Sequence, residues 1–455
     1  MLMPFPQGRK IYKPTLWALF GDETVDLASF VAHDPDNYLV FLRKKIPWYR
    51  LDKILREQCG YSETKGRRAI STQMMLGIHI FKYLNNLSDR EAIREFTCNP
   101  FVQYLCGRQT MEFKPPFTRQ SMIGFRKRFE GGEEVLNRIL GEVLAVAGLR
   151  SVDVEQIIID STCFEKNVRF PTDVRLIERA ISYVWKFRKK YGVRMRRAYR
   201  KEMKKLSRTV RFDGRSKGNR EAVEAAKARI RAILGILLRD FTRKYQGQKI
   251  SLSQEDLQML TRCGVVQAQV KGSRNKIYSL HEPQVVCVAK NKAGKKYEFG
   301  TKVTLAISKA GLIVGCVPFM HNPNDSKTVE AVVRNAEKVT GFKTVEAVGD
   351  RGYRQPKGAK DILGGRVRIS IPEAGGANTP EEKAAAREKF GRRASIEPRI
   401  EHVKDDHRAR RNYLHGRCGD VFNAMFSCIA FDLKKLVSWH EEEVRKKERR
   451  NMAAA

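Results

Sequence analysis

Long hydrophobic runs are missing from this sequence of 455 residues. The longest apolar stretch, around Ile233 to Leu238, is far shorter than the roughly 20 residues that a helix needs to cross a bilayer. The N-terminal residues also lack the hydrophobic segment of a secretory signal peptide. These absences predict a soluble, cytoplasmic protein with no membrane partner.

Paired cysteines and zinc-binding spacings are missing as well. The nine cysteines include no Cys-x-x-Cys pair, and the eight histidines show no zinc-finger spacing. An odd and scattered set of cysteines is typical of free thiols in a reducing compartment. A disulfide framework and a structural zinc site are therefore not expected.

Acidic residues are scarce relative to basic ones. The chain has 88 Lys and Arg against 51 Asp and Glu, which gives a net charge of +37. Repulsion of this size opposes a compact state unless a polyanion offsets it, so nucleic acid is the expected partner. An anionic membrane surface or the ribosome is the alternative that the charge alone leaves open.

Apolar content, by contrast, is ample. Hydrophobic residues make up 42% of the chain and include 23 Phe and 14 Tyr, which is enough to build folded cores. A chain of this length is expected to divide into two or three domains. Residues 1–58 show no long periodic pattern and are interpreted as an N-terminal arm that includes a short helix.

Residues 59–148 have the pattern of a helical domain. Apolar residues recur at spacings of three and four from Ser71, and Ser88 with Glu91 predicts the capping box of a second helix. A third helix is expected from Thr118, with four basic side chains on its outer face: Arg119, Arg126, Lys127 and Arg128. Short helices with a basic face suit a DNA-binding bundle of the helix-turn-helix type. The alternative is a plain helical bundle with a solvated charged face.

Residues 172–279 form a strongly basic segment in which Lys and Arg alternate with aromatic residues. The densest part includes Lys189, Lys190, Arg196 and Arg197. The apolar pattern predicts two long helices that pair across the loop 213–218. Their basic face is expected to follow a DNA backbone without reading the base sequence. A solvated, charged helical hairpin is the alternative.

Strands are predicted on both sides of this basic segment. The apolar run Val154 to Ile159 reads as a buried strand that ends at Asp160. Three strands follow the basic segment, then a helix over 327–340, a strand Thr344 to Val348 closed by Asp350, one more strand and a last helix. Asp325 is interpreted as the N-cap of the first of these helices, with a metal ligand as the alternative.

A stretch near the C-terminus places one acid between two bases. Three residues separate Arg393 from Glu397, and six separate Glu397 from Lys404. On a helix Glu397 and Lys404 would share one face, about two turns apart. A carboxylate can hold a divalent metal while flanking cations contact phosphate oxygens. With Asp160 and Asp350, Glu397 would complete a metal-dependent phosphodiester site.

These residues resemble the DDE transposases of bacterial insertion sequences, in particular the group of the type-four and type-five elements. That group carries a Tyr-(2)-Arg-(3)-Glu-(6)-Lys signature, which Arg393, Glu397 and Lys404 fit, whereas Phe390 occupies the tyrosine position and lacks its hydroxyl. The resemblance continues in four stretches outside the basic segment: 86–91, 280–284, 297–302 and 411–420.

The resemblance implies an α/β fold: a ribonuclease-H-like catalytic core with an N-terminal helical domain and a helical insertion. It implies that Asp160, Asp350 and Glu397 bind two Mg²⁺ or Mn²⁺ ions, since hard cations prefer carboxylate oxygens. It also implies that Arg393 and Lys404 contact phosphates or flanking bases, and that Arg351 and Tyr353 shape the site around Asp350, where Arg351 would also contact DNA. Arg126 and Arg128 are the expected DNA contacts of the helical domain.

The implied activity is transposition, in which the element's ends are cut and the resulting 3′-hydroxyl attacks target DNA. The implied partners are double-stranded DNA, as terminal inverted repeats and target, and a second copy of the chain on paired ends, in the cytoplasm at the bacterial nucleoid. A DNA-binding protein or repressor of transposase origin that no longer cuts is the alternative, and a nuclease without strand transfer is a third possibility.

The expected organisation follows from these patterns. Its parts are an N-terminal arm (1–58), a helical DNA-binding domain (59–148), a catalytic domain in two pieces (149–171 and 280–440), a basic helical insertion (172–279) and a charged tail (441–455).

Overall fold

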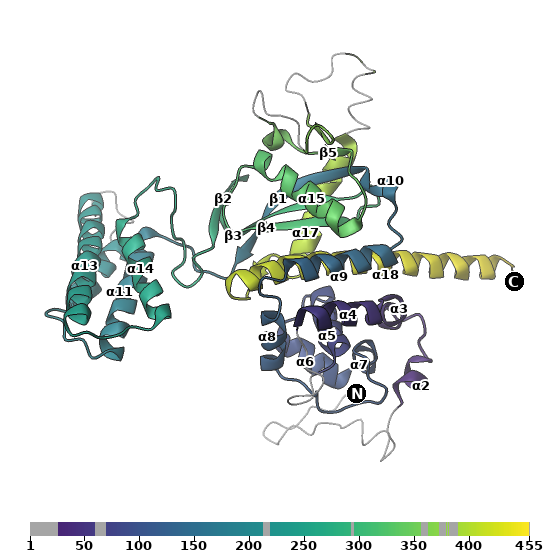
Figure 1. Cartoon of the computed structure of the whole chain (residues 1–455), viewed down its shortest axis with the longest axis horizontal. Coiled ribbons are helices and arrows are strands. Elements are labelled where there is room, and N and C mark those ends of the chain that lie inside the picture. Colours follow the sequence, from purple (N-terminus) through teal and green to yellow (C-terminus); the bar gives the residue numbers. More distant parts are fainter. Residues whose placement is uncertain are drawn as a thin grey trace, which may run out of the picture.

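The computed structural model has three parts: an N-terminal group of helices, a sheet flanked by helices, and a separate helical insertion (Figure 1). The described residues are 26–59, 70–212, 219–292, 295–355, 363–372, 379, 381 and 390–454. In Figure 1 the insertion stands apart from the other two parts and is joined to them by the two segments that lead into and out of it.

The N-terminal part is helical. Its helices are α2 (Leu27–Val31), α3 (Tyr38–Lys45), α4 (Trp48–Cys59), α5 (Thr72–Leu84), α6 (Asp89–Cys98), α7 (Pro100–Leu105), α8 (Arg119–Lys127) and α9 (Glu133–Val146). The helix starts predicted at Ser71, Ser88 and Thr118 are confirmed, because each side chain accepts a hydrogen bond from a backbone N–H of the first turn. Ser88 and Glu91 form the expected capping box.

The described part of the predicted N-terminal arm consists of packed helices. Leu39, Leu42, Leu51 and Leu55 are buried and belong to the same hydrophobic core as the helices that follow. The short helix predicted in this arm is confirmed as α4, whereas periodicity did not reveal α2 and α3, which have only five and eight residues and are too short for a repeating pattern. Residues 1–25 lie outside the described residues.

One mixed sheet forms the second part. Its strands are β1 (Gln156–Lys166), β2 (Val286–Lys292), β3 (Lys295–Ile307), β4 (Ile313–Phe319), β5 (Glu346–Val348), β6 (Arg368–Ser370) and β7 (Arg411–Asn412). The order is β2-β3-β1-β5-β6, with β4 also paired to β3 and β7 to β1. β3 is antiparallel to β1, β2 and β4, whereas β5 and β7 are parallel to β1 and β6 is parallel to β5.

Helices cover both faces of this sheet. They are α10 (Ser151–Val154), α15 (Val329–Thr340), α17 (Ile396–Asp406) and α18 (Gly416–Ala454), with short 3-10 turns η3 (Asp325–Lys327), η4 (Arg351–Tyr353) and η5 (Arg392–Ser395). Helix α15 packs closely on one face, since a Cβ at Gly315 would lie 3.3 Å from the Val332 carbonyl oxygen. The predicted order of strand, helical insertion, three strands, helix, two strands and helix is confirmed.

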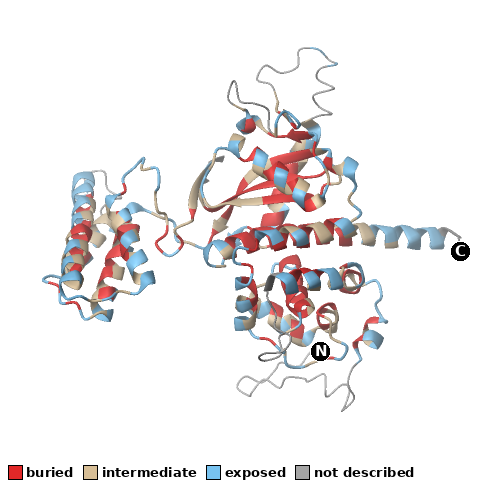
Figure 2. Cartoon of the chain, viewed as in Figure 1, coloured by how far each residue is buried: buried red, intermediate tan, exposed pale blue. Residues whose placement is uncertain are grey.

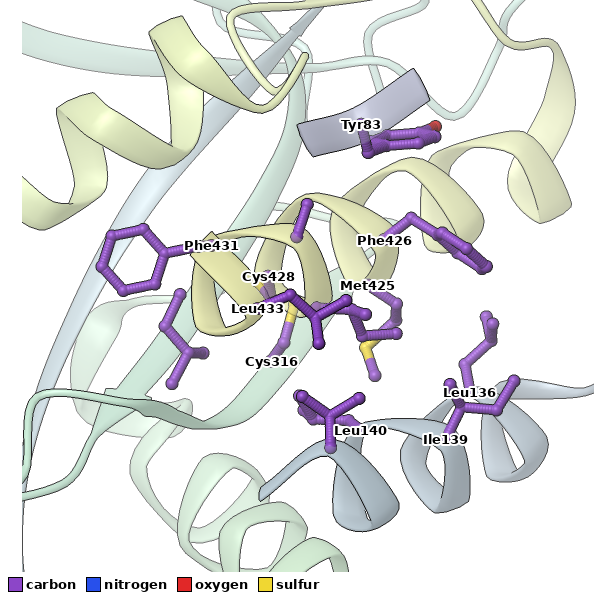
Figure 3. Packing of buried hydrophobic residues seen from close by; sticks show 14 of the residues in the cluster. Tyr83, Leu136, Ile139, Leu140, Cys316, Met425, Phe426, Cys428, Phe431 and Leu433 are labelled. Carbon is purple, nitrogen blue, oxygen red and sulfur yellow. The ribbon is translucent and has the colours of Figure 1, made fainter. Parts of the chain in front are cut away.

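Helix α18 joins the first two parts. In Figure 1 it runs between the sheet and the N-terminal helices, and Figure 3 shows its Met425 and Cys428 among side chains of α9 and β4. Helix α18 is therefore buried on several sides over residues 421–437. Beyond that the helix continues to Ala454 with an exposed surface (Figure 2), so the predicted charged tail is helical.

The described residues of the insertion form four helices, where the sequence predicts two long helices and a short third helix capped by Ser253, and this cap is confirmed. They are α11 (Asp173–Lys190), α12 (Arg200–Phe212), α13 (Arg220–Gly247) and α14 (Gln254–Ala268). The first predicted helix breaks after Lys190 because Gly192 adopts the left-handed conformation, with φ +64°, which glycine tolerates at a helix end. The loop 213–218 lies outside the described residues.

The insertion also has a hydrophobic core of its own. Ile181, Phe187, Leu237 and Phe241 are among its buried members, and none of them belongs to the core shared by the N-terminal helices and the sheet. Among the described helices, none is both long and apolar enough to span a membrane.

Candidate active site

Asp160 lies in the middle of β1. The prediction that the strand ends at Asp160 is wrong: β1 continues to Lys166, because its other edge pairs with β3 as far as Glu165. On the side of β5, however, pairing stops at Ile158, and β7 joins β1 only from Glu165. On this edge of β1, Asp160 therefore lies between the end of the pairing with β5 and the start of the pairing with β7. In open α/β sheets, ligands bind at the carboxyl ends of the strands, which is where Asp160 lies relative to β5.

Asp350 is brought next to Asp160 by the register of these strands. Ile158 pairs with Val348 in parallel, so Asp160 and Asp350 each follow this last pair by two positions, and the charges of both act on Tyr353. Asp350 Oδ1 accepts a hydrogen bond from the N–H of Gly352 at 2.8 Å, and Asp160 Oδ1 accepts one from the N–H of Ser161 at 2.8 Å. The side chain of Asp350 remains 42% exposed, so it is accessible to a ligand.

Glu397 approaches from the helix over the same face of the sheet. Gln156, Ile158 and Asp160 alternate along β1 and so point to one face. Gln156 and Ile158 line a cavity of about 40 Å³ together with Ser395 and Arg399, which shows that the start of α17 covers that face. Glu397 lies in the first turn of α17 and is exposed.

The donor chemistry of these residues fits a hard divalent cation, but the structure groups them only in part. Carboxylate oxygens are the ligands that Mg²⁺ and Mn²⁺ prefer. Within the described ranges, no three His, Cys, Asp or Glu side chains are close enough to hold one metal ion. Asp160 and Asp350 are thus brought together, whereas Glu397 lies on the correct face without completing a group of three.

The two predicted flanking bases of Glu397 differ in position. Arg393, in η5, places its Nη2 atom 4.0 Å from Asp350 Oδ2. Lys404 is buried, with its Nζ atom 3.9 Å from Glu401 Oε1. Lys404 follows the buried Ile400 by four residues and lies with it on the buried face of α17, which does not favour the predicted phosphate contact, and that contact stays a prediction.

Asp325 is a fourth acid near the site. It is not the N-cap of α15, which is Thr328, and the N-cap of η3 is Asn324. Its Oδ1 atom lies 2.7 Å from Nζ of the buried Lys302. A Cβ at Gly352 would lie 3.0 Å from Asp350 Oδ1 and 3.3 Å from Asp325 Oδ2, so the two carboxylates flank this glycine.

Tyr353 is buried beside these acids. Its hydroxyl oxygen lies 2.8 Å from Ser161 Oγ, which in turn lies 2.8 Å from Thr304 Oγ1. Burial raises the pKa of Tyr353 well above its ordinary value, and the charges of Asp160, Asp325 and Asp350 raise this pKa further. Sequence reasoning identified Tyr353 but not the hydrogen bonds that join its hydroxyl to Ser161 and Ser161 to Thr304, because these contacts depend on the packing of distant segments.

The predicted basic face of the N-terminal helices is partly wrong. Arg119, Lys127 and Arg128 are exposed, but Arg126 is buried and forms two hydrogen bonds with Asp89, at 3.0 and 2.7 Å. The reason is helical spacing: Arg126 is four residues after the buried Met122 and therefore points inward with it. Arg126 is unsuited to contact DNA.

The predicted basic residues of the insertion are exposed. Lys189, Lys190, Arg196 and Arg197 all lie on its surface, although Lys190 forms an ion pair with Asp256 and Arg197 lies 4.0 Å from Glu202. The sequence of this segment, residues 172–279, contains 29 Lys and Arg against nine Asp and Glu. More than half of the net charge of the chain is therefore concentrated in the insertion.

Comparisons with known proteins identify two transposase family matches in this chain. The family described as "Transposase domain" matches residues 28–128, and the family described as "Transposase DDE domain" matches residues 274–433, which include Asp350 and Glu397 but not Asp160. An uncharacterized protein, ORF8 in the nfe locus of Rhizobium meliloti, is 31% identical over 176 residues, which cover 38% of this chain and 84% of the relative. No solved structure matches the chain.

Proposed function

Because the chain belongs to the DDE transposases of bacterial insertion sequences, we propose that it binds the ends of such an element, cuts the DNA there and joins it to a target. The observation that supports this proposal is the register of β1 and β5, which puts Asp160 and Asp350 each two residues beyond the last pair of these strands. The helix that carries Glu397 covers the same face of the sheet. We place the catalytic site at these three residues.

The sheet supports a ribonuclease-H-like catalytic core. Its strand order is β2-β3-β1-β5-β6, with β4 also paired to β3; β3 is antiparallel to β1, β2 and β4, β5 is parallel to β1, and β6 is parallel to β5. Helix α15 connects β4 to β5, and α17 follows β6. This is the arrangement that the resemblance implies for such a core, with a helical insertion between the first two strands.

Divalent metal, as two Mg²⁺ or Mn²⁺ ions, is the cofactor that we assign to Asp160, Asp350 and Glu397. When bound, such ions activate the attacking oxygen and stabilise the leaving oxygen of a phosphodiester. The protein's part is to hold three carboxylates in one place despite their mutual repulsion. Arg393, whose guanidinium already lies beside Asp350, is placed to reduce that repulsion and to contact a phosphate.

Double-stranded DNA is the partner that we assign to the basic surfaces. The insertion offers Lys189, Lys190, Arg196 and Arg197, and the N-terminal helices offer Arg128. Arg351 is exposed directly after Asp350, where a scissile phosphate would lie. We further propose that the protein acts as a homodimer on paired ends, in the cytoplasm in association with the nucleoid.

The test is a cleavage and joining assay on linear DNA that carries the element's own ends. We expect cutting and joining in Mg²⁺, and we expect Asp160→Asn and Asp350→Asn each to lower the cleavage rate by roughly a thousandfold or more. Both variants should still bind the ends in a gel-shift assay, because removal of a negative charge does not weaken attraction to phosphates. Cutting without joining would indicate a nuclease, and end binding without cutting would indicate a repressor.

A further inference from the structure

Tyr353 contacts the immediate neighbours of both aspartates. Its ring packs on Gly349, which directly precedes Asp350, and its hydroxyl is hydrogen-bonded to Ser161, which directly follows Asp160. We propose that Tyr353 is a positioning residue that holds Asp160 and Asp350 at the separation that metal binding requires. This inference rests on the proposed function, since it assumes that these two aspartates are the metal ligands.

The contact with Gly349 is close enough to fix the backbone before Asp350. A Cβ at this position would lie 2.8 Å from Cδ2 of the Tyr353 ring, a distance that real Cβ atoms essentially never show, and 3.0 Å from Cγ. Glycine is therefore required for the ring to lie here. The ring in turn limits how far the backbone at Gly349 can move toward it.

The hydroxyl end of Tyr353 is fixed to the sheet. Ser161 Oγ lies 2.8 Å from the Tyr353 hydroxyl and 2.8 Å from Thr304 Oγ1, and Thr304 is fully buried in β3. The N–H of Ser161 also donates to Asp160 Oδ1 at 2.8 Å. A chain of side-chain hydrogen bonds thus runs from β3 through β1 to η4 and includes the residue that orients the Asp160 carboxylate.

A link of this kind is needed because the backbone does not provide one. Pairing between β1 and β5 ends at Ile158 and Val348, two residues before the aspartates. Two carboxylates at neighbouring positions repel each other in the absence of a cation. Among the described contacts, Tyr353 is the side chain that joins the segment after β5 to the segment of β1 beyond the last backbone pair.

The test removes the hydroxyl alone. Tyr353→Phe keeps the ring on Gly349 and deletes the bond to Ser161, and Tyr83→Phe is the matched control. Tyr83 is fully buried and its hydroxyl donates to Asn423 Oδ1 at 3.1 Å, in the core beneath α18. Both substitutions therefore remove one buried hydroxyl and one hydrogen bond, but only one of them acts between the aspartates.

Two quantities are measured for each variant: the Mn²⁺ affinity of the protein–DNA complex, by electron paramagnetic resonance of free Mn²⁺, and the cleavage rate as a function of Mg²⁺ concentration. We expect Tyr353→Phe to weaken Mn²⁺ binding by roughly fivefold to tenfold, the effect of one hydrogen bond. The Mg²⁺ concentration for half-maximal cleavage should rise by a similar factor, whereas Tyr83→Phe should change neither quantity. DNA-end binding should be unchanged in both variants.

Ser161→Ala provides a second route if Tyr353→Phe fails to fold. It should weaken Mn²⁺ binding to a similar extent, and the double variant should be no weaker than either single variant, because both remove the same bond. Unchanged Mn²⁺ affinity in Tyr353→Phe, or an equal loss in Tyr83→Phe, would overturn the inference. If the wild type does not cut DNA but binds Mn²⁺ through Asp160 and Asp350 with the expected Tyr353 effect, the inference stands and the proposed activity fails.

Discussion

Lys166 and Glu282 form a buried ion pair at the root of the insertion, with Nζ 3.0 Å from Oε2 and both side chains 3% exposed. Lys166 is the last residue of β1, and Glu282 lies where the chain returns from the insertion. The Lys166 ammonium also pairs with Asp420 of α18, 2.5 Å away, and Asn412 donates to the same carboxylate at 2.7 Å. Stretches 280–284 and 411–420, separate in sequence, thus meet in one buried polar cluster.

Removal of the cation from this cluster should strongly destabilise the protein. Lys166→Met keeps the length of the side chain but leaves two buried carboxylates without their cation, which typically costs about 3–5 kcal/mol of unfolding free energy. Urea denaturation followed by circular dichroism measures this change. Lys338→Met is the matched control, because Lys338 pairs with Glu134 at the surface, where the side chains are 58% and 50% exposed.

The control should lose no more than about 1 kcal/mol, as exposed pairs do. Equal effects of the two substitutions would show that the Lys166 cluster contributes no more than a surface pair.

A second buried charge cluster lies among the N-terminal helices, and it predicts how stability depends on pH. Burial favours the neutral form of Asp89, but the buried cations Lys82 and Arg126 outweigh burial and hold the pKa of Asp89 well below its ordinary value. A carboxyl group with a lowered pKa stabilises the folded state above its unfolded pKa of about 4, and this contribution is lost as the pH falls below that value. Wild-type stability should therefore decrease as the pH is lowered from about 5.

Asp89→Asn tests this assignment. At pH 7 the variant should lose about 3–5 kcal/mol, because Lys82 and Arg126 remain buried without their anion. Its stability should also change less than that of the wild type between about pH 5 and pH 3 in denaturant titrations. Parallel pH curves for the two proteins would show that other carboxyl groups cause the loss at low pH.

The salt dependence of DNA binding tests the role of the insertion. Each phosphate contact should contribute roughly 0.9 log unit of affinity per log unit of salt. Replacement of Lys189, Lys190, Arg196 and Arg197 by Gln should therefore flatten the slope measured by fluorescence anisotropy. The matched control removes four charges from the exposed end of α18 by replacement of Arg445, Lys446, Lys447 and Arg449.

The control should change the slope less, because the end of α18 leads away from both the sheet and the insertion (Figure 1). An unaltered slope in the insertion variant would assign that surface to solvent or to a protein contact.

The sequence predicted well what local patterns determine, and less well what depends on packing between distant segments. Capping residues such as Ser88 and Thr118 act within one turn, so the helix starts that they mark are correct. Arg126 shares the inward face of α8 with Met122, but the anion that compensates its buried charge is Asp89 on another helix, and no pattern within α8 reveals that partner. Tertiary ion pairs of this kind override the expectation that a basic residue faces solvent.

In the candidate site, too, features set by local sequence were predicted, and features set by packing between distant segments were not. Asp160 and Asp350 could be identified because each follows an apolar run, but the continuation of β1 to Lys166 depends on its pairing with β3, which the run of side chains does not encode. Asp325 was interpreted as a helix cap because its local sequence suits that role. Asp325 lies beside Gly352 because η4, which follows β5, packs against η3, and the local sequence of Asp325 does not reveal this contact.

The last prediction concerns which glutamate of α17 completes the site. Glu397 lies in the first turn of α17 and its side chain is exposed, so it is accessible to a ligand. Glu401, one turn further on, is engaged by Arg410, whose Nη2 lies 2.6 Å from Oε2, and by Lys404 at 3.9 Å. Glu397→Gln should therefore abolish cleavage and strand transfer together, whereas Glu401→Gln should retain both and lose at most about 1 kcal/mol of stability, since its pairs are partly exposed. The measurement is single-turnover cleavage in Mg²⁺ with chemical denaturation of both variants. Loss of cleavage in Glu401→Gln alone would contradict this prediction and would place the third ligand one turn further along α17. It would also separate that ligand from Arg393, whose contact with Asp350 places the start of α17 at the site.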